Sequence, residues 1–130
     1  MRIAFWLFGL TSLANGLWML AAPAQWYADL PAGVPDTGPL NLHFVRDIGA
    51  AFTTFGVMFL VTASRAERHR GVLLAAGLFY VLHAAIRVTD LFAGRLGVDH
   101  WLIDLPGVFL PAIALAVLAL PRFWPEPADR

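Results

Sequence analysis

The sequence predicts an all-α integral membrane protein, folded as a four-helix bundle, and its composition and apolar pattern both point there. Of its 130 residues 59% are hydrophobic and 14% are charged, and the mean hydropathy is +0.68. A soluble domain is about 45–50% apolar and about 25% charged. A soluble chain of this length could not bury so much apolar surface. The apolar residues also fall into four stretches, each near the roughly 20 residues that a membrane-spanning helix needs.

These four stretches are the expected helices of a single transmembrane domain over residues 1–130. They run from about Ile3 to Ala22, from Leu42 to Ala63, from Gly71 to Phe92 and from Trp101 to Leu120. Short polar connections separate the later stretches, so consecutive helices should be antiparallel neighbours.

The arginines predict how the helices are oriented. The connection Ser64–Arg70 holds three arginines, whereas the Pro- and Gly-rich connection Pro23–Asn41 holds none. Cytoplasmic loops carry the excess of Lys and Arg. We therefore expect a multi-pass protein of the bacterial inner membrane, with both termini in the cytoplasm and Pro23–Asn41 outside.

Charged residues recur at one depth in three of the stretches. Seventeen uncharged residues separate Asp47 from Arg65, sixteen separate Arg87 from Arg70, and seventeen separate Asp104 from Arg122. Each run is about 25 Å long as a helix, which is shorter than the ~30 Å hydrocarbon core. Charges at this depth are costly and by default indicate a functional site, here in the outer half of the bundle.

Helical spacing gathers further polar residues around these charges. The second stretch carries three polar residues at i, i+3 and i+4, and the third carries four at steps of 3, 4 and 3, so each set shares one face. With the aspartate of the fourth stretch, the expected ligand-binding residues are His43, Arg46, Asp47, Tyr80, His83, Arg87, Asp90 and Asp104. We expect the charged members to converge in the interior with His100 nearby, and His83 to form the base of the site.

The fourth stretch contains two prolines that should disturb it. Proline removes a backbone donor and crowds the carbonyl four residues earlier. Pro106 is expected in the first helical turn, where proline is tolerated. Pro111 is therefore the expected kink.

Two interpretations of the polar residues compete. They can form an interhelical ion-pair network that fixes how the helices pack, since buried pairs can specify one arrangement with little net stabilisation. They can instead form a pocket for a small amphipathic molecule or a quinone head, because apolar walls with a few convergent polar groups are typical of ligand sites.

Other classes of site have weaker support. Histidines with carboxylates suit several metals, but the nearby arginines repel cations and no H-E-x-x-H-type motif is present, so we expect no metal site. A proton or solute pathway would need an oligomer, because four helices seldom enclose one. The sequence has no cysteine, and its two serines lack a plausible base, so no catalytic residue is expected. Zero net charge and no basic run argue against nucleic acid.

The layout resembles that of small bacterial four-helix membrane proteins of the DoxX-like kind. The resemblance rests on four helices in about 130 residues, on Arg2-Ile3 with Phe8-Gly9-Leu10, and on the segment from Asn41 to Gly49, which reads NLHFVRDIG. It implies a link to quinone-coupled redox complexes and assigns no catalytic residue or cofactor.

Taken together, we expect a membrane protein that binds a small amphipathic ligand or acts within a membrane redox or transport complex. The alternative is a structural or accessory subunit whose charges fix helix packing. Expected partners are the lipid bilayer, an amphipathic molecule or quinone, and other membrane subunits or further copies of the chain.

Overall fold

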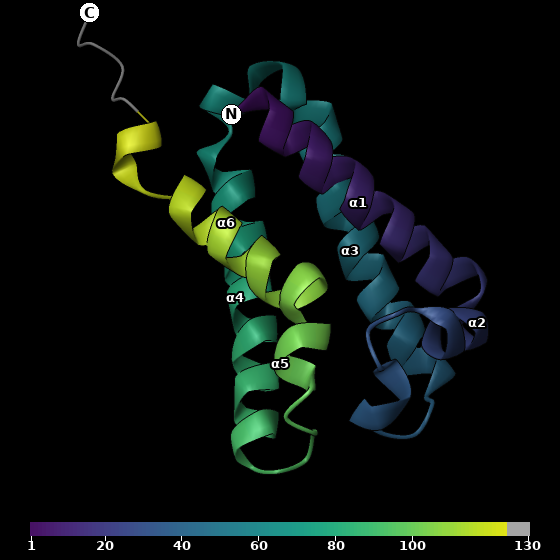
Figure 1. The fold of residues 1–130 in the computed structure, drawn as a ribbon. Coiled ribbons are helices and arrows are strands. Elements are labelled where there is room, and N and C mark those ends of the chain that lie inside the picture. Colours follow the sequence, from purple (N-terminus) through teal and green to yellow (C-terminus); the bar gives the residue numbers. More distant parts are fainter. Residues whose placement is uncertain (125–130) are drawn as a thin grey trace, which may run out of the picture.

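The computed structural model describes residues 1–124, and this part of the chain is all-helical (Figure 1). Three helices are long and apolar enough to cross a membrane: α1 (Arg2–Ala21), α3 (Leu42–Thr62), which runs on into the 3-10 turn η2 (Ala63–Arg68), and α4 (Arg70–Phe92). Each lies within two residues of its expected bounds. Asn41 caps α3, because its side-chain oxygen accepts from the backbone N–H groups of the next turn.

The fourth apolar stretch is broken into separate segments, so the single helix with a kink at Pro111 that was expected there is wrong. It consists of α5 (His100–Ile103), the π-helical segment η3 (Leu105–Phe109) and α6 (Leu110–Leu118), followed by the 3-10 turn η4 (Pro121–Phe123).

The break is at Pro106 rather than at Pro111. Pro106 supplies no N–H at the start of η3, and the backbone N–H groups of Val108 and Phe109 both donate to the carbonyl of Asp104, at 2.8 and 3.2 Å. The missing donor and the bulk of the ring widen the helix there into a π turn. Pro111 lies in the first turn of α6, where proline is tolerated. The expected roles of the two prolines are therefore reversed.

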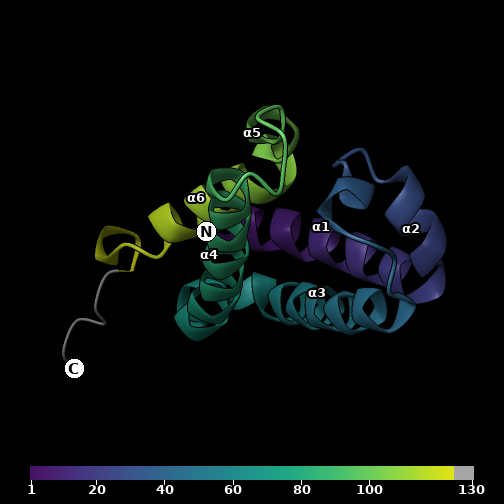
Figure 2. The ribbon, with the colours of Figure 1, turned by 90° about the horizontal axis from the view of Figure 1, so that it is seen from below.

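The helices form two pairs that diverge from one end of the molecule. α1 packs along α3, and α4 packs on α6. Figures 1 and 2 show the α1–α3 pair separating from α4, α5 and α6. At the closed end Phe5, Phe59, Leu73 and Leu115 are fully buried and belong to one core that joins both pairs. The space between the pairs therefore widens toward the opposite end.

Glycines permit the close approach of α1 and α3. A Cβ at Gly16 would lie 2.5 Å from the backbone N of Thr53, and one at Gly56 would lie 2.6 Å from the backbone N of Leu13. Small residues at such positions let two helix backbones approach closely in a membrane.

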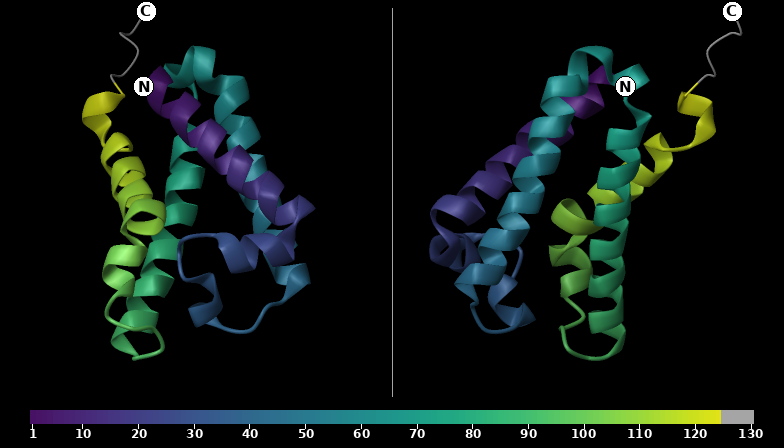
Figure 3. Two further views of the ribbon diagram at one scale, coloured as in Figure 1. Left: turned by 45° about the vertical axis from the view of Figure 1, so that its right-hand side comes forward. Right: turned by 180° about the vertical axis from the view of Figure 1, so that it is seen from behind.

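The two ends of the molecule differ in their connections. The start of α1 and the η2 connection lie together at the closed end, where Arg2 and Glu67 form an ion pair at 2.9 Å (Figure 1). The opposite end carries the short helix α2 (Pro23–Asp29), the 3-10 turn η1 (Val34–Thr37) and α5. Figure 3 shows the α2–η1 segment reaching from the α1–α3 pair toward α4.

Candidate functional site

A cavity of about 700 Å³ lies between the two helix pairs. Its walls come from α1, α3, α4, η3 and α6, and Leu30, Pro31, Ala32 and Val34 line it at the wide end. Phe8, Met19, Ile48, Phe52 and Val108 contribute to a largely apolar lining. A volume in the range of about 300–1,000 Å³ with mostly apolar walls is usual for a small-molecule site.

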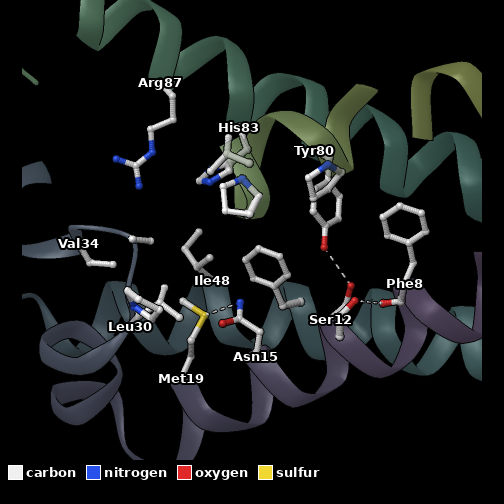
Figure 4. Close-up of a pocket in the computed structure, with 18 of the residues that line it drawn as sticks. Phe8, Ser12, Asn15, Met19, Leu30, Val34, Ile48, Tyr80, His83 and Arg87 are labelled. Carbon is white, nitrogen blue, oxygen red and sulfur yellow. Dashed lines mark hydrogen bonds between the residues drawn. The ribbon is translucent and has the colours of Figure 1, made fainter. Parts of the chain in front are cut away.

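Polar groups face the cavity from two sides (Figure 4). From α1, Asn15 accepts a hydrogen bond from Trp26 Nε1 at 2.9 Å. The buried hydroxyls of Ser12 and Tyr80 lie 3.0 Å apart and are joined by a hydrogen bond across the gap between α1 and α4. His83 follows Tyr80 on α4 and stacks on Phe79. These polar groups lie at different depths along the cavity. The polar head group of a bound molecule can therefore find a hydrogen-bonding partner at more than one depth.

Arg87 supplies the charge of the site. Figure 4 shows its guanidinium projecting from α4 into the part of the cavity that Val34 and Leu30 line. Its Nε lies 3.9 Å from Oδ2 of Asp104, a fully buried carboxylate at the break between α5 and η3. No hydrogen bond joins the guanidinium to another side chain or carbonyl of residues 1–124, so its N–H groups are available to a bound molecule.

A second polar cluster continues from Asp104 away from the cavity. Nδ1 of His100 lies 3.5 Å from Asp104 Oδ2, and Nε2 of the same ring lies 3.3 Å from Oδ2 of Asp36 in η1. His100 and Asp104 are buried. Both Asp104 oxygens and His100 Nδ1 lack a hydrogen-bond partner within the described chain. Unmade hydrogen bonds on buried groups are costly and call for a functional or structural explanation.

The structure brings together four of the eight residues predicted for the site. Tyr80, His83 and Arg87 line the cavity, and Asp104 contacts Arg87 from behind the wall. Their assignment to ligand binding stays a prediction. Asp90 does not line the cavity. Its carboxylate instead pairs with Arg95 of the following connection at 2.6 Å.

The three predicted residues of α3 do not join them. His43 and Asp47 pair with each other at 3.3 Å on an outer face, with side chains 83% and 59% exposed, and Arg46 is exposed as well. The expected convergence of these charges in the interior is therefore wrong. Gly49 and Gly56 must face α1, and that rotation turns Ile48 and Phe52 toward the cavity and Asp47 away from it.

Sequence reasoning gave too little weight to His100 and missed Asp36. His100 is four residues before Asp104, and this spacing was the available signal, since i and i+4 share a helix face. Nothing in the sequence pairs Asp36 with a histidine 64 residues away. In the described residues no group of three or more His, Asp or Glu side chains is arranged to hold a metal ion.

The comparisons with known proteins place the chain in a family without assigning it an activity. No curated protein and no solved structure matches it significantly. A family model described as "Domain of unknown function (DUF4345)" matches residues 1–103, about four fifths of the sequence, and the chain therefore belongs to that family.

Proposed function

We propose that this membrane protein binds a small amphipathic molecule in the cavity between its two helix pairs, with a neutral, carbonyl-bearing head of the quinone class. The observation that carries the proposal is the position of Arg87, whose free N–H groups project into a largely apolar cavity of about 700 Å³. An apolar body would lie along Phe8, Phe52 and Val108, and the head would lie toward Arg87.

The charges around Arg87 favour a neutral head over an anionic one. Asp104 offsets the guanidinium at 3.9 Å, and Asp36 adds a second carboxylate beside His100. The four groups together carry no net positive charge, whether or not His100 is protonated. An anion entering this site would gain little Coulomb energy to repay its desolvation, whereas a carbonyl oxygen can accept hydrogen bonds at a smaller cost.

The donors available suit carbonyl acceptors at two depths. Arg87 presents several N–H groups in a fixed fork, and the His83 ring can donate from either nitrogen, depending on its tautomer. The resemblance to DoxX-like proteins, some of which are linked to quinone-coupled redox complexes, supports the same class of ligand. A role within a membrane redox or transport complex is part of this proposal.

Decylubiquinone, a short-chain quinone, tests the proposal directly. Quinones quench tryptophan fluorescence, and Trp26 lines the cavity, so titration of the purified protein in detergent should show saturable quenching. His83→Phe preserves the stacking on Phe79 and removes a donor. Since one hydrogen bond contributes on the order of 1 kcal/mol, we expect the variant to bind about five- to tenfold more weakly.

His43→Phe is the matched control, because His43 is an exposed histidine on α3 that lies outside the cavity. It should bind decylubiquinone like the unmodified protein. Non-saturable quenching, or equal affinities for all three proteins, would support the alternative function of a structural or accessory subunit. That alternative is favoured by one observation, namely that the contacts Arg87–Asp104 and Asp36–His100 also tie α4 to η3 and η1 to α5.

We further propose that the protein lies in the bacterial inner membrane with the closed end of the bundle in the cytoplasm. Three arginines in residues 64–70 and none in residues 23–41 support this orientation.

Cysteine labelling tests the orientation, since the native sequence has no cysteine. Thr37 and Ser64 are exposed residues in the two opposite connections. In intact cells without an outer-membrane barrier, Thr37→Cys should react with a membrane-impermeant maleimide, and Ser64→Cys should react only after the inner membrane is permeabilised. The reverse pattern would invert the proposed topology.

A further inference from the structure

His100 is the one imidazole in the described chain that lies between two carboxylates. Its Nε2 is 3.3 Å from Asp36 Oδ2, and its Nδ1 is 3.5 Å from Asp104 Oδ2. The Asp36 side chain is 66% exposed to solvent, whereas that of Asp104 is 0% exposed. The three side chains therefore lie in order from the molecular surface to a buried carboxylate behind the cavity wall. His100 and Asp36 are hydrogen-bonded, whereas His100 Nδ1 and Asp104 Oδ2 are close but make no hydrogen bond in this arrangement.

This arrangement constrains where the protons can be. A neutral imidazole has one N–H, so it can donate to one carboxylate while its other nitrogen is an acceptor. Two ionised carboxylates facing the ring would then leave one oxygen opposed to a nitrogen lone pair. The cluster avoids this conflict when the ring carries two protons or when one of the aspartates carries one. Protonation states of the three side chains that differ only in where one proton lies are thus compatible with the same positions of the heavy atoms.

We propose that Asp36, His100 and Asp104 form a proton relay, which exchanges protons between the aqueous phase at the open end of the bundle and the buried carboxylate behind the cavity wall. Asp36 meets the water. Asp104 is the inner terminus, and Arg87 on the cavity wall lies beside it. The charged groups facing the ring are Asp36 from η1 and Asp104 from its own segment, and Arg87 from α4 faces Asp104.

The transfer step balances without any further reactant. Asp36 takes a proton from a hydronium ion, which is left as water. The O–H bond of Asp36 then breaks as an N–H bond forms at Nε2, while the N–H bond at Nδ1 breaks and an O–H bond forms at Asp104. Asp36 is left as a carboxylate, Asp104 becomes neutral, and the imidazole changes tautomer. Deprotonation of Asp104 is the reverse of the same step.

Because the proton returns by the same route, the imidazole of His100 does not have to rotate between the two transfers. The packing around the ring is tight enough to hold it in one orientation. A Cβ at Gly33 would lie 2.8 Å from Cε1 of His100, so the η1 backbone presses closely on the imidazole edge. Gly33 has φ of +56°, which glycine adopts readily and other residues rarely do. The glycine thus lets the loop hold the ring between the two carboxylates.

The relay does not depend on what binds in the cavity, so it can be tested without a ligand. In the experiment, the pH around purified protein in lipid nanodiscs is lowered rapidly by photolysis of a caged proton. Time-resolved infrared spectroscopy follows the carbonyl stretch of protonated Asp104, assigned by its loss in Asp104→Asn. Removing a positioned proton carrier should slow this signal at least about tenfold in His100→Ala. Added imidazole should restore the rate, because it can occupy the vacated space and carry the proton.

Two carboxylate variants locate the entry point. Asp36→Asn should slow the protonation of Asp104, whereas Asp99→Asn, an exposed aspartate beside His100 in the sequence, should leave it unchanged. Circular dichroism and size-exclusion chromatography verify that each variant is folded. An unchanged rate in His100→Ala, a slow rate that imidazole fails to restore, or an Asp104 that never protonates would each overturn the relay. None of these outcomes bears on decylubiquinone binding, which the fluorescence titration measures separately.

Discussion

Replacing Arg87 with methionine is expected to destabilise the protein by about 3–5 kcal/mol, because it leaves a buried carboxylate without its cation. Asp104 is fully buried, and neither of its oxygens has a hydrogen-bond partner within residues 1–124. Its one fixed cationic neighbour there is Arg87, at 3.9 Å. Methionine keeps much of the volume of the arginine stem and removes the charge, so the loss reports on the electrostatic contact rather than on packing.

The double variant Arg87→Met/Asp104→Leu should regain most of the lost stability. Removing both partners of a buried ion pair is often neutral or stabilising, whereas removing one is not. Thermal unfolding in detergent, followed by circular dichroism, measures the difference. Arg95→Met is the control, because its pair with Asp90 is at the surface and should contribute about 1 kcal/mol or less. A double variant no more stable than Arg87→Met would show that Arg87 and Asp104 are not energetically coupled.

The parts of the structure that the sequence predicts are those set by local physics. Long apolar runs give α1, α3 and α4 because a helix satisfies its own backbone in lipid. Asn41 is a predictable cap. The face shared by Tyr80, His83 and Arg87 follows from helical spacing alone, and all three do line the cavity.

The error at Asp47 shows what such reasoning leaves out. Counting residues from the end of the bundle that is expected to be cytoplasmic gives the depth of a side chain along its helix. It does not give the direction in which the side chain points, because that depends on how the helix is rotated against its neighbour. In α3 the glycines fix the rotation by requiring contact with α1, and Asp47 then lies on the outer face.

The remaining features depend on contacts between distant segments. The π turn at Asp104 follows from Pro106 only when the helix continues on both sides of it. The Asp36–His100 contact needs the loop from α2 to η1 to cross the open end of the bundle, and no periodic pattern reports the path of a loop. The residues of α4 that line the cavity could thus be predicted from the sequence. The contact between Asp36 and His100, which links Asp104 to the surface, could not.

Gly56→Leu is expected to separate α1 from α3 and to lower stability by 3 kcal/mol or more, above the usual ~1–3 kcal/mol of an overpacked site. A Cβ at Gly56 would lie 2.6 Å from the backbone N and 2.8 Å from the Cα of Leu13. A side chain can rotate away from such a contact, but a helix backbone cannot, so the two helices must move apart. The separation forfeits dispersion contacts along the whole interface, which drive helix association in lipid.

Gly71→Leu is the matched control, since nothing lies within 4 Å of the Cβ position at the start of α4. Both variants add the same apolar side chain to a helical glycine, and a gain in helix propensity at Gly56, in the interior of α3, would raise stability rather than lower it. Thermal unfolding in detergent should show a large loss for Gly56→Leu and little change for Gly71→Leu. Equal stabilities would mean that α1 and α3 do not meet through their backbones. Because α1 and α3 also supply Phe8, Asn15, Ile48 and Phe52 to the cavity wall, Gly56→Leu should also weaken decylubiquinone binding, whereas Gly71→Leu should not.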